Sequence, residues 1–194
     1  MLDKAVVDLS HWDEVDSFED AMDDGVVGII HKATESNNYF DPTYNQRKRD
    51  ALAAGLLWGA YHFLRPGNMK DQAQYFVSKV GKDLDLYAAD HEDEGVSLDD
   101  LKTFLREVKR LTGKSPIIYS GHVLKEQLGD RRDSELSQYR LCWRNTHQVR
   151  QAGQKRHSRN GGSGNTQSMV NATAFLATAT AISTSMNMPV PSNS

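Results

Sequence analysis

Apolar and polar residues alternate in blocks over the first 141 residues of this chain. Short apolar runs typical of buried strands lie at residues 6–9, 26–34, 57–64, 84–89, 117–119 and 139–141. Segments compatible with helices separate them, at residues 14–24, 42–54, 69–80 and 98–111. Strands that alternate with helices form parallel sheets with right-handed crossovers. The pattern therefore predicts an α/β fold, built either as a (β/α) barrel or as an open doubly wound sheet.

The ends of the predicted helices carry residues suited to those positions. Asp41 can cap the second helix, with Pro42 in its first turn, and Gly55 suits the position just after its end. Ser97 can cap the helix that follows it. An apolar stripe on that helix is expected to face the core: Leu98, Leu101, Leu105, Val108 and Leu111.

The composition changes abruptly after residue 141. All 26 Asp and Glu residues lie in residues 1–141, whereas residues 142–194 contain five basic residues and no acidic one. The remaining 18 of the 23 Lys and Arg residues leave the first part with a net charge of −8, against +5 for the second. The second part also lacks periodicity, which predicts no stable structure there. We therefore expect one domain in residues 1–141 and a separate tail in residues 142–194.

Composition also narrows the classes of function. No apolar stretch approaches the ~20 residues that a membrane-spanning helix needs, and the first residues lack the basic and apolar regions of a signal peptide. The single cysteine, Cys142, excludes an internal disulfide framework. The acidic first part argues against nucleic-acid binding, and the chain has no glycine-rich phosphate loop and no H-E-x-x-H motif. We expect no cofactor, no metal, no nucleic-acid partner and no membrane insertion.

One strand-like run ends in a cluster of acidic residues that carries the candidate chemistry. Residues 86–89 are apolar and lead directly into Asp90, His91 and Glu92. Side chains alternate along a strand, so Asp90 and Glu92 are predicted on the same side, with Cα atoms roughly 6.5–7 Å apart. Asp8 lies near the carboxyl end of the first predicted strand, and barrels carry their chemistry at the carboxyl ends of strands. Glycoside hydrolysis requires two nearby carboxyl groups in different environments.

Each of these patterns also has a simpler interpretation. A D-x-E sequence alone fits a solvated acidic loop better than a catalytic pair, because Asp and Glu are mostly exposed. The acids with His91 would also suit a metal ion, although no further ligand motif supports one. Tyr61 and its neighbours fit ordinary strand packing, although Tyr61 in particular would also suit a sugar site. His11 and Trp12 fit a loop over the first strand.

Seven segments taken together resemble glycoside hydrolase family 25, the Chalaropsis-type lysozymes. They are, in order, VVDLSHWD, GIIHKATES, FDPTYNQRKRDALAAGLLWGAYHFLRPG, QAQYFVSKV, AADHED, TGKSPIIYSGHVL and YRL, within residues 5–141. Linked motifs in one order are more specific than the D-x-E pair alone. The resemblance implies a modified (β/α) barrel and a muramidase, which cleaves the β-1,4 bond between N-acetylmuramic acid and N-acetylglucosamine.

The resemblance also implies roles for residues at the strand ends. The D-x-E pair of the family falls on Asp90 and Glu92, and its first-strand aspartate falls on Asp8. These positions make Glu92 the general acid, while Asp90 and Asp8 orient groups or stabilise charge. The implied lining of the substrate site is Lys32, Glu35, Tyr61 and Tyr119. The implied partner is the glycan of peptidoglycan, bound by a monomer, and the nucleophile is either a protein carboxylate or the acetamido group of the substrate.

Residues 142–194 lack the later motifs that the resemblance implies, including a last-strand aspartate. Shifting the reading frame near codon 142 permits L-A-Q-Y, W-Q-Y and N-E-Y-A in the order of the family. We therefore hypothesise that residues 142–194 are an out-of-frame translation of a family C-terminus, which leaves the barrel incomplete and impairs activity. The alternative function is a non-catalytic remnant that at most binds glycan. The nucleotide sequence tests the hypothesis, and a stop codon before the last motif in the other frame would refute it.

Overall fold

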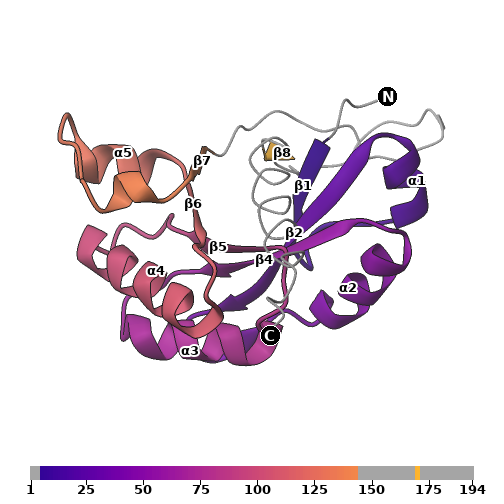
Figure 1. The fold of residues 1–194 in the computed structure, drawn as a ribbon, viewed down its shortest axis with the longest axis horizontal. Helices are drawn as coiled ribbons and strands as arrows, with labels where there is room; N and C mark the ends of the chain where they lie inside the picture. The colour runs from indigo at the N-terminus through magenta and orange to yellow at the C-terminus, as the bar shows by residue number, and fades with distance from the viewer. Residues whose placement is uncertain (1–4, 144–168, 171–194) are drawn as a thin grey trace, which may run out of the picture.

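The computed structural model describes residues 5–143 and 169–170, which form one sheet flanked by helices (Figure 1). The strands are β1 (Ala5–Leu9), β2 (Val26–Glu35), β3 (Tyr39–Phe40), β4 (Leu57–Phe63), β5 (Leu86–Asp90), β6 (Ile117–Ser120), β7 (Leu141–Trp143) and β8 (Met169–Val170). The helices are α1 (Phe18–Asp23), α2 (Tyr44–Ala53), α3 (Met69–Val80), α4 (Leu98–Thr112) and α5 (His122–Leu128), with a 3-10 turn at Leu136–Gln138.

The sheet confirms the predicted alternation of strands and helices. Its strands follow the order β7-β6-β5-β4-β2-β1-β8, and β3 pairs with β2 outside this path. Each pair from β7 to β1 along this order is parallel, whereas β3 and β8 pair antiparallel with β2 and β1. Helices α2, α3 and α4 lie along one side of the sheet, and α5 lies beside β6 and β7 (Figure 1).

The sheet curls so that strands far apart in its order come face to face. The Tyr119 hydroxyl on β6 donates a hydrogen bond of 3.2 Å to Oδ2 of Asp8 on β1. Three strands separate β6 from β1, so a flat sheet would hold these two strands about 19 Å apart. A side-chain contact across that span requires a curled half-barrel. The barrel-type fold predicted from the sequence is therefore confirmed, and the open doubly wound sheet is excluded.

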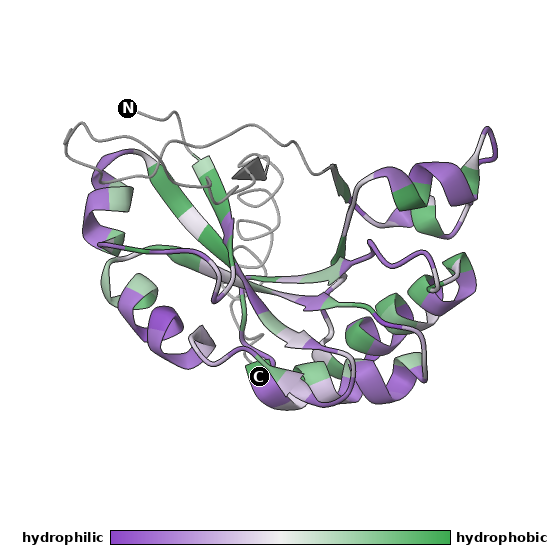
Figure 2. Ribbon diagram, turned by 180° about the vertical axis from the view of Figure 1, so that it is seen from behind, coloured by the Kyte–Doolittle hydropathy of each residue, from purple (hydrophilic) through white to green (hydrophobic). Residues whose placement is uncertain are grey.

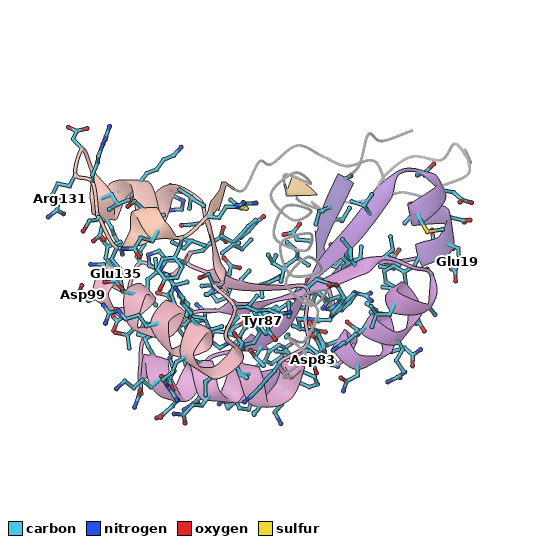
Figure 3. The ribbon with its side chains drawn as sticks, in the orientation of Figure 1. Glu19, Asp83, Tyr87, Asp99, Arg131 and Glu135 are labelled. Carbon is cyan, nitrogen blue, oxygen red and sulfur yellow. The ribbon has the colours of Figure 1, made fainter. Side chains whose placement is uncertain are left out.

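The two faces of the sheet bury different side chains. The face toward the helices packs the larger cluster, which includes Trp58, Tyr87, Phe76 and Phe104. Tyr87 lies between the sheet and α3, with its ring 6.1 Å from that of Phe76 (Figure 3). The concave face holds a smaller buried cluster of Val6, Ile30, Leu86, Ala88, Ile117, Tyr119 and Cys142. The strands are accordingly largely hydrophobic, while the helices carry hydrophobic and hydrophilic stretches in alternation (Figure 2).

Helices α3 and α4 begin where the sequence predicts, and they end within a residue of the prediction. Ser97 accepts a hydrogen bond from the backbone of Asp100, whose side chain accepts one from the backbone of Ser97. This reciprocal cap fixes the start of α4. Gly113 takes a left-handed φ of 76° and ends the helix. The predicted apolar stripe belongs to the larger core cluster, with its end residues Leu98 and Leu111 partly buried against it.

Helix α2 begins at Tyr44, with Thr43 at the N-cap position, so the prediction that Asp41 caps it was wrong. The Asp41 side chain is fully buried and accepts hydrogen bonds from N and Oγ1 of Thr43, at 2.9 and 2.7 Å. Its Oδ2 also lies 3.0 Å from both N and Nδ1 of His11. The carboxylate therefore ties the turn before α2 to the loop after β1, and the helix starts only after that turn.

Strand β3, helix α5 and the 3-10 turn were not predicted, because each is too short to show a period. The predicted sixth strand is β7, which pairs parallel with β6. The predictions for residues 144–168 and 171–194 lie outside the described residues, whereas Met169–Val170 pair with β1. Within the part of the chain that the structure describes, no helix is long and apolar enough to cross a membrane.

Candidate active site

Five of the residues identified in the sequence lie on the concave face of the sheet. Asp8, Lys32 and Asp90 each follow a buried residue of the concave cluster by two positions on the same strand. Because side chains alternate along a strand, these three point to the concave side. Tyr61 and Tyr119 pack within the concave cluster itself. The predicted residues therefore come from β1, β2, β4, β5 and β6 onto one face.

Tyr119 brings two of the carboxylates into a single site. It pairs in register with Asp90 across β5 and β6, and its hydroxyl donates to Asp8 at 3.2 Å. Asp90 is nearly buried, with 4% of its surface exposed, whereas Asp8 is half-buried. Two carboxylates that differ in exposure to solvent thus lie on either side of one tyrosine.

Glu92 lies just beyond β5, because that strand ends at Asp90. The alternation of a strand therefore does not set the direction of its side chain. A Cβ atom at Gly121 would lie 3.8 Å from Oε1 of Glu92, so the carboxyl group reaches the turn that follows β6. That turn comes two residues after Tyr119. Glu92 consequently lies at the same end of the sheet as the carboxylates that Tyr119 joins.

His91 anchors the chain between Asp90 and Glu92. Its backbone N donates to the carbonyl of Tyr119 at 2.8 Å, and its carbonyl accepts from Oγ of Ser120 at 2.6 Å. Its ring is fully buried, and Nε2 lies 3.0 Å from Oε1 of Gln127 on α5. Burial lowers the pKa of His91, against the opposing effect of the Gln127 hydrogen bond. The neutral ring therefore donates through Nε2 to the amide oxygen and fixes the loop to α5.

The same loop is held on its other side by an ion-pair chain from the neighbouring strands. Arg65 lies 2.9 Å from Asp93 and 2.8 Å from Glu35, and Lys32 lies 2.6 Å from Glu35. Burial alone would raise the pKa of Glu35, but the hydrogen bonds from Lys32 and Arg65 hold it below its ordinary value. Glu35 is therefore an ionised acceptor and is unsuited to donate a proton near neutral pH.

Aromatic rings line the same rim. The Nζ of Lys32 lies 5.1 Å from the ring centre of Phe63 and 5.4 Å from that of Tyr39. The guanidinium of Arg65 lies 4.6 Å from the centre of the same Phe63 ring. Cations packed against rings in this way hold both groups in defined positions. The rim thus presents ordered charges and flat apolar faces together.

Two histidines on the same strands belong to the opposite face. His62 is fully buried, with its ring stacked 4.9 Å from that of Phe104, and His31 stacks 5.6 Å from Trp58. Burial lowers the pKa of each to about 4. They are packing residues on the helix side of the sheet, whereas Tyr61, the residue before His62, packs against the concave cluster.

The arrangement of the described side chains also bears on metal binding. Across residues 5–143, no three His, Cys, Asp or Glu side chains are grouped so as to hold a metal ion.

The sequence did not predict the roles of Arg65, Asp93 and Gln127, which position the acidic loop. Arg65 reads as part of a turn before proline, and Gln127 lies on a helix of seven residues. The acidic run itself was the available indication that a cation would lie opposite it.

Comparisons with known proteins agree with this geometry. A family model described as glycosyl hydrolases family 25 matches residues 7–166. The chain is 36% identical over 77 residues to lysozyme M1 of Streptomyces globisporus, covering 39% of this chain and 26% of that protein. It is 26% identical over 134 residues to the N,O-diacetylmuramidase of Chalaropsis sp., covering 58% of this chain and 64% of that protein. The chain thus spans less than two thirds of the length of either relative.

A solved structure shares the fold. The structure of a family 25 lysozyme from Aspergillus fumigatus matches with a TM-score of 0.72 and 23% sequence identity. The match covers 91% of this chain and 98% of that chain. At this identity the likeness concerns the fold alone. It supports the curled parallel sheet with helices on its outer side.

Proposed function

The chain belongs to glycosyl hydrolases family 25, and we propose that it hydrolyses the β-1,4 bond between N-acetylmuramic acid and N-acetylglucosamine in peptidoglycan. The observation that carries the proposal is the set of three acidic residues at one end of the curled sheet. Asp8 and Asp90 lie on either side of Tyr119, and Glu92 reaches the turn that follows β6. The names of the lysozyme and diacetylmuramidase relatives support the same substrate class.

In this proposal Glu92 is the general acid that protonates the glycosidic oxygen as the bond breaks. Its partial exposure leaves it accessible to the substrate. Asp90 and Asp8 stabilise the positive charge that develops on the sugar ring, since an oxocarbenium-like transition state attracts carboxylates. The Tyr119 hydroxyl keeps Asp8 aimed at the site. Fixed charges of this kind stabilise the transition state without rearranging during the reaction.

The proposed substrate-binding residues are Lys32, Glu35, Tyr61 and Tyr119. Lys32 and Glu35 form a close ion pair that offers a donor and an acceptor to the hydroxyl and acetamido groups of the sugars. The two tyrosines form part of the concave wall. Sites for neutral ligands typically combine apolar walls with a few placed polar groups. The glycan would therefore lie along the carboxyl ends of β2, β4, β5 and β6.

Clearing of a suspension of purified cell walls, with release of muropeptides, tests the proposal. Replacing Glu92 by Gln should lower the rate by roughly 100-fold or more, because general acid catalysis contributes about that factor. Glu94→Gln is the matched control, since Glu94 is an exposed acid in the same loop. Its rate should stay close to that of the original chain. Clearing that persists in Glu92→Gln would rule out the catalytic assignment, and glycan binding without any product would favour the non-catalytic remnant.

A further inference from the structure

Trp12 is the most exposed large hydrophobic side chain in the part of the chain that the structure describes, with 73% of its surface exposed. It lies in the loop after β1, four residues beyond Asp8. Single exposed apolar side chains are common on protein surfaces and need no function. Exposure alone therefore does not indicate a binding site. The contacts that hold Trp12 in place are the relevant evidence.

The loop that carries Trp12 is tied at both ends. Ser10 donates from its backbone N and from Oγ to Oδ2 of Asp13, at 2.7 and 3.2 Å. Arg47 on α2 donates to the carbonyls of Ser10 and Asp13. Hydrogen bonds of a charged donor are stronger than neutral ones. The backbone on either side of Trp12 is thus fixed to helix α2.

The ring of His11 packs against the indole of Trp12. The two ring centres lie 4.4 Å apart at an angle of 41°. His11 is held in turn by Asp41 and by the Tyr39 hydroxyl, each 3.0 Å from its Nδ1. Burial alone would raise the pKa of Asp41, but hydrogen bonds from Thr43 and His11 keep it below its ordinary value. A buried, ionised carboxylate is costly unless hydrogen-bonded, and here it serves to fix the residue under an exposed tryptophan.

This support is continuous with the proposed active site. Tyr39, which contacts His11 through its hydroxyl, has its ring 5.4 Å from Nζ of Lys32. Lys32 is one of the proposed substrate-binding residues on the concave face. The row from Lys32 through Tyr39 and His11 therefore leads from the active site to Trp12 along the carboxyl ends of β1 and β2.

We propose that Trp12 is a sugar-binding platform, whose indole face stacks on an N-acetylhexosamine ring of the same glycan strand, away from the bond that is cleaved. The platform rests on the proposed function, which supplies the identity of the glycan. A pyranose ring presents a face of C–H groups, which packs against the electron-rich face of an aromatic ring. A tryptophan already held in place loses little conformational freedom on binding.

Calorimetric titration with soluble glycan strands freed of their peptides tests the platform. The titrations use the Glu92→Gln background, in which the strands are not consumed. Trp12→Ala should weaken binding by roughly 5- to 20-fold, comparable to the loss of one stacked aromatic ring elsewhere. Trp12→Leu should weaken it similarly, whereas Trp12→Tyr should retain most of the affinity because a flat ring remains. Leu52→Ala on α2 is the control, since Leu52 is also exposed and should bind unchanged.

The outcomes separate the platform from the proposed function, which is measured by wall digestion with the unaltered chain. Digestion together with equal affinities for Trp12→Ala and its parent overturns the platform alone. Full affinity in Trp12→Leu also overturns it, because apolar area would then suffice. Glycan binding that depends on Trp12 without any digestion supports the platform and overturns the muramidase. Neither binding nor digestion by a chain folded by circular dichroism overturns both.

Discussion

Tyr119 contacts both β5 and β1, the strands that carry two of the candidate carboxylates. It is nearly buried, it pairs with Asp90 in the sheet, and it donates to Asp8 from the far side of the curl. Without its hydroxyl, Asp8 loses a hydrogen-bond donor that helps to aim its carboxylate. The Tyr119 hydroxyl therefore links Asp8 on β1 to β6, the strand that pairs with Asp90.

Replacing Tyr119 by Phe should lower kcat more than it raises KM, because the ring remains while Asp8 loses one of its hydrogen bonds. Loss of the hydrogen bond should lower the free energy of unfolding by about 1 kcal/mol. Steady-state kinetics on solubilised glycan and urea unfolding measure the two effects. Tyr75→Phe on α3 is the control, since Tyr75 lies on a helix outside the site. Equal kcat values for Tyr119→Phe and the control would contradict the role given to the hydroxyl.

Individual site residues were predictable from sequence where the order of strands and helices reports their place in the sheet. That order predicted Asp8 and Asp90 at the carboxyl ends of parallel strands, and both lie there in the structure. The residues that position the acidic loop were not predictable, because their partners are distant in sequence. Gln127 lies 36 residues from His91, and Arg65 lies 28 from Asp93. No local period reports such contacts.

Among the elements, the loops after β4 and β5 act as one unit. Arg65 in the first loop pairs with Asp93 in the second. The pair is half-exposed, so it contributes little to stability and acts mainly on geometry. A Cβ atom at Gly95 would lie only 2.8 Å from Cγ of Pro66, so the two loops pack with no space for a side chain. Movement of either loop would therefore displace Glu92.

Gly95→Ala should lower both the melting temperature and the rate of wall digestion, because the added methyl group overlaps Pro66 and pushes the loops apart. The added strain should be on the order of 1–3 kcal/mol. Pro66→Ala in the same chain removes the overlapping atom and should restore much of the loss. A double-mutant cycle measures this coupling. Additive effects of the two substitutions would show that the loops do not press on each other at this point.

The helices show which elements a sequence can predict. For α3 and α4, periodicity and end residues agree, so the predicted and observed bounds nearly coincide. For α2, the sequence Asp41-Pro42 has the form of a helix start, yet the structure uses the carboxylate of Asp41 to hold His11 and Thr43. A tertiary contact thus overrides a local preference. Such a contact is visible only once the chain is folded.

At the scale of the whole molecule, stability depends on pH through buried neutral histidines, three of which lie in the part that the structure describes. Burial lowers the pKa of His31 and His62 to about 4 and also lowers that of His91. In the unfolded chain these side chains take up protons near pH 6.5. Their contribution is therefore complete above about pH 6.5 and is lost as the pH falls toward 4. Below that range the folded state also takes up the protons, and the loss levels off.

Urea unfolding at several pH values between 7 and 4 should show this decline. Each of the two histidines with a pKa of about 4 should account for up to about 3 kcal/mol, since one pKa unit corresponds to 1.36 kcal/mol. His62→Asn should be less stable at pH 7 but should show a shallower decline. The slope near pH 5 should fall by about 1.4 kcal/mol per pH unit, the contribution of one proton. An unchanged slope in His62→Asn would contradict the assignment.

The hydrogen bond between Tyr119 and Asp8 joins residues 111 positions apart, and this separation has a consequence for folding kinetics. Closing so long a loop is slow compared with forming helices or pairing neighbouring strands. Helices and the β2–β4 pairing can form while β1 and β6 are still apart. The curl closes only when these two strands meet. During refolding, circular dichroism should therefore recover before any wall-digesting activity, since the candidate site is complete only once this long-range contact has formed.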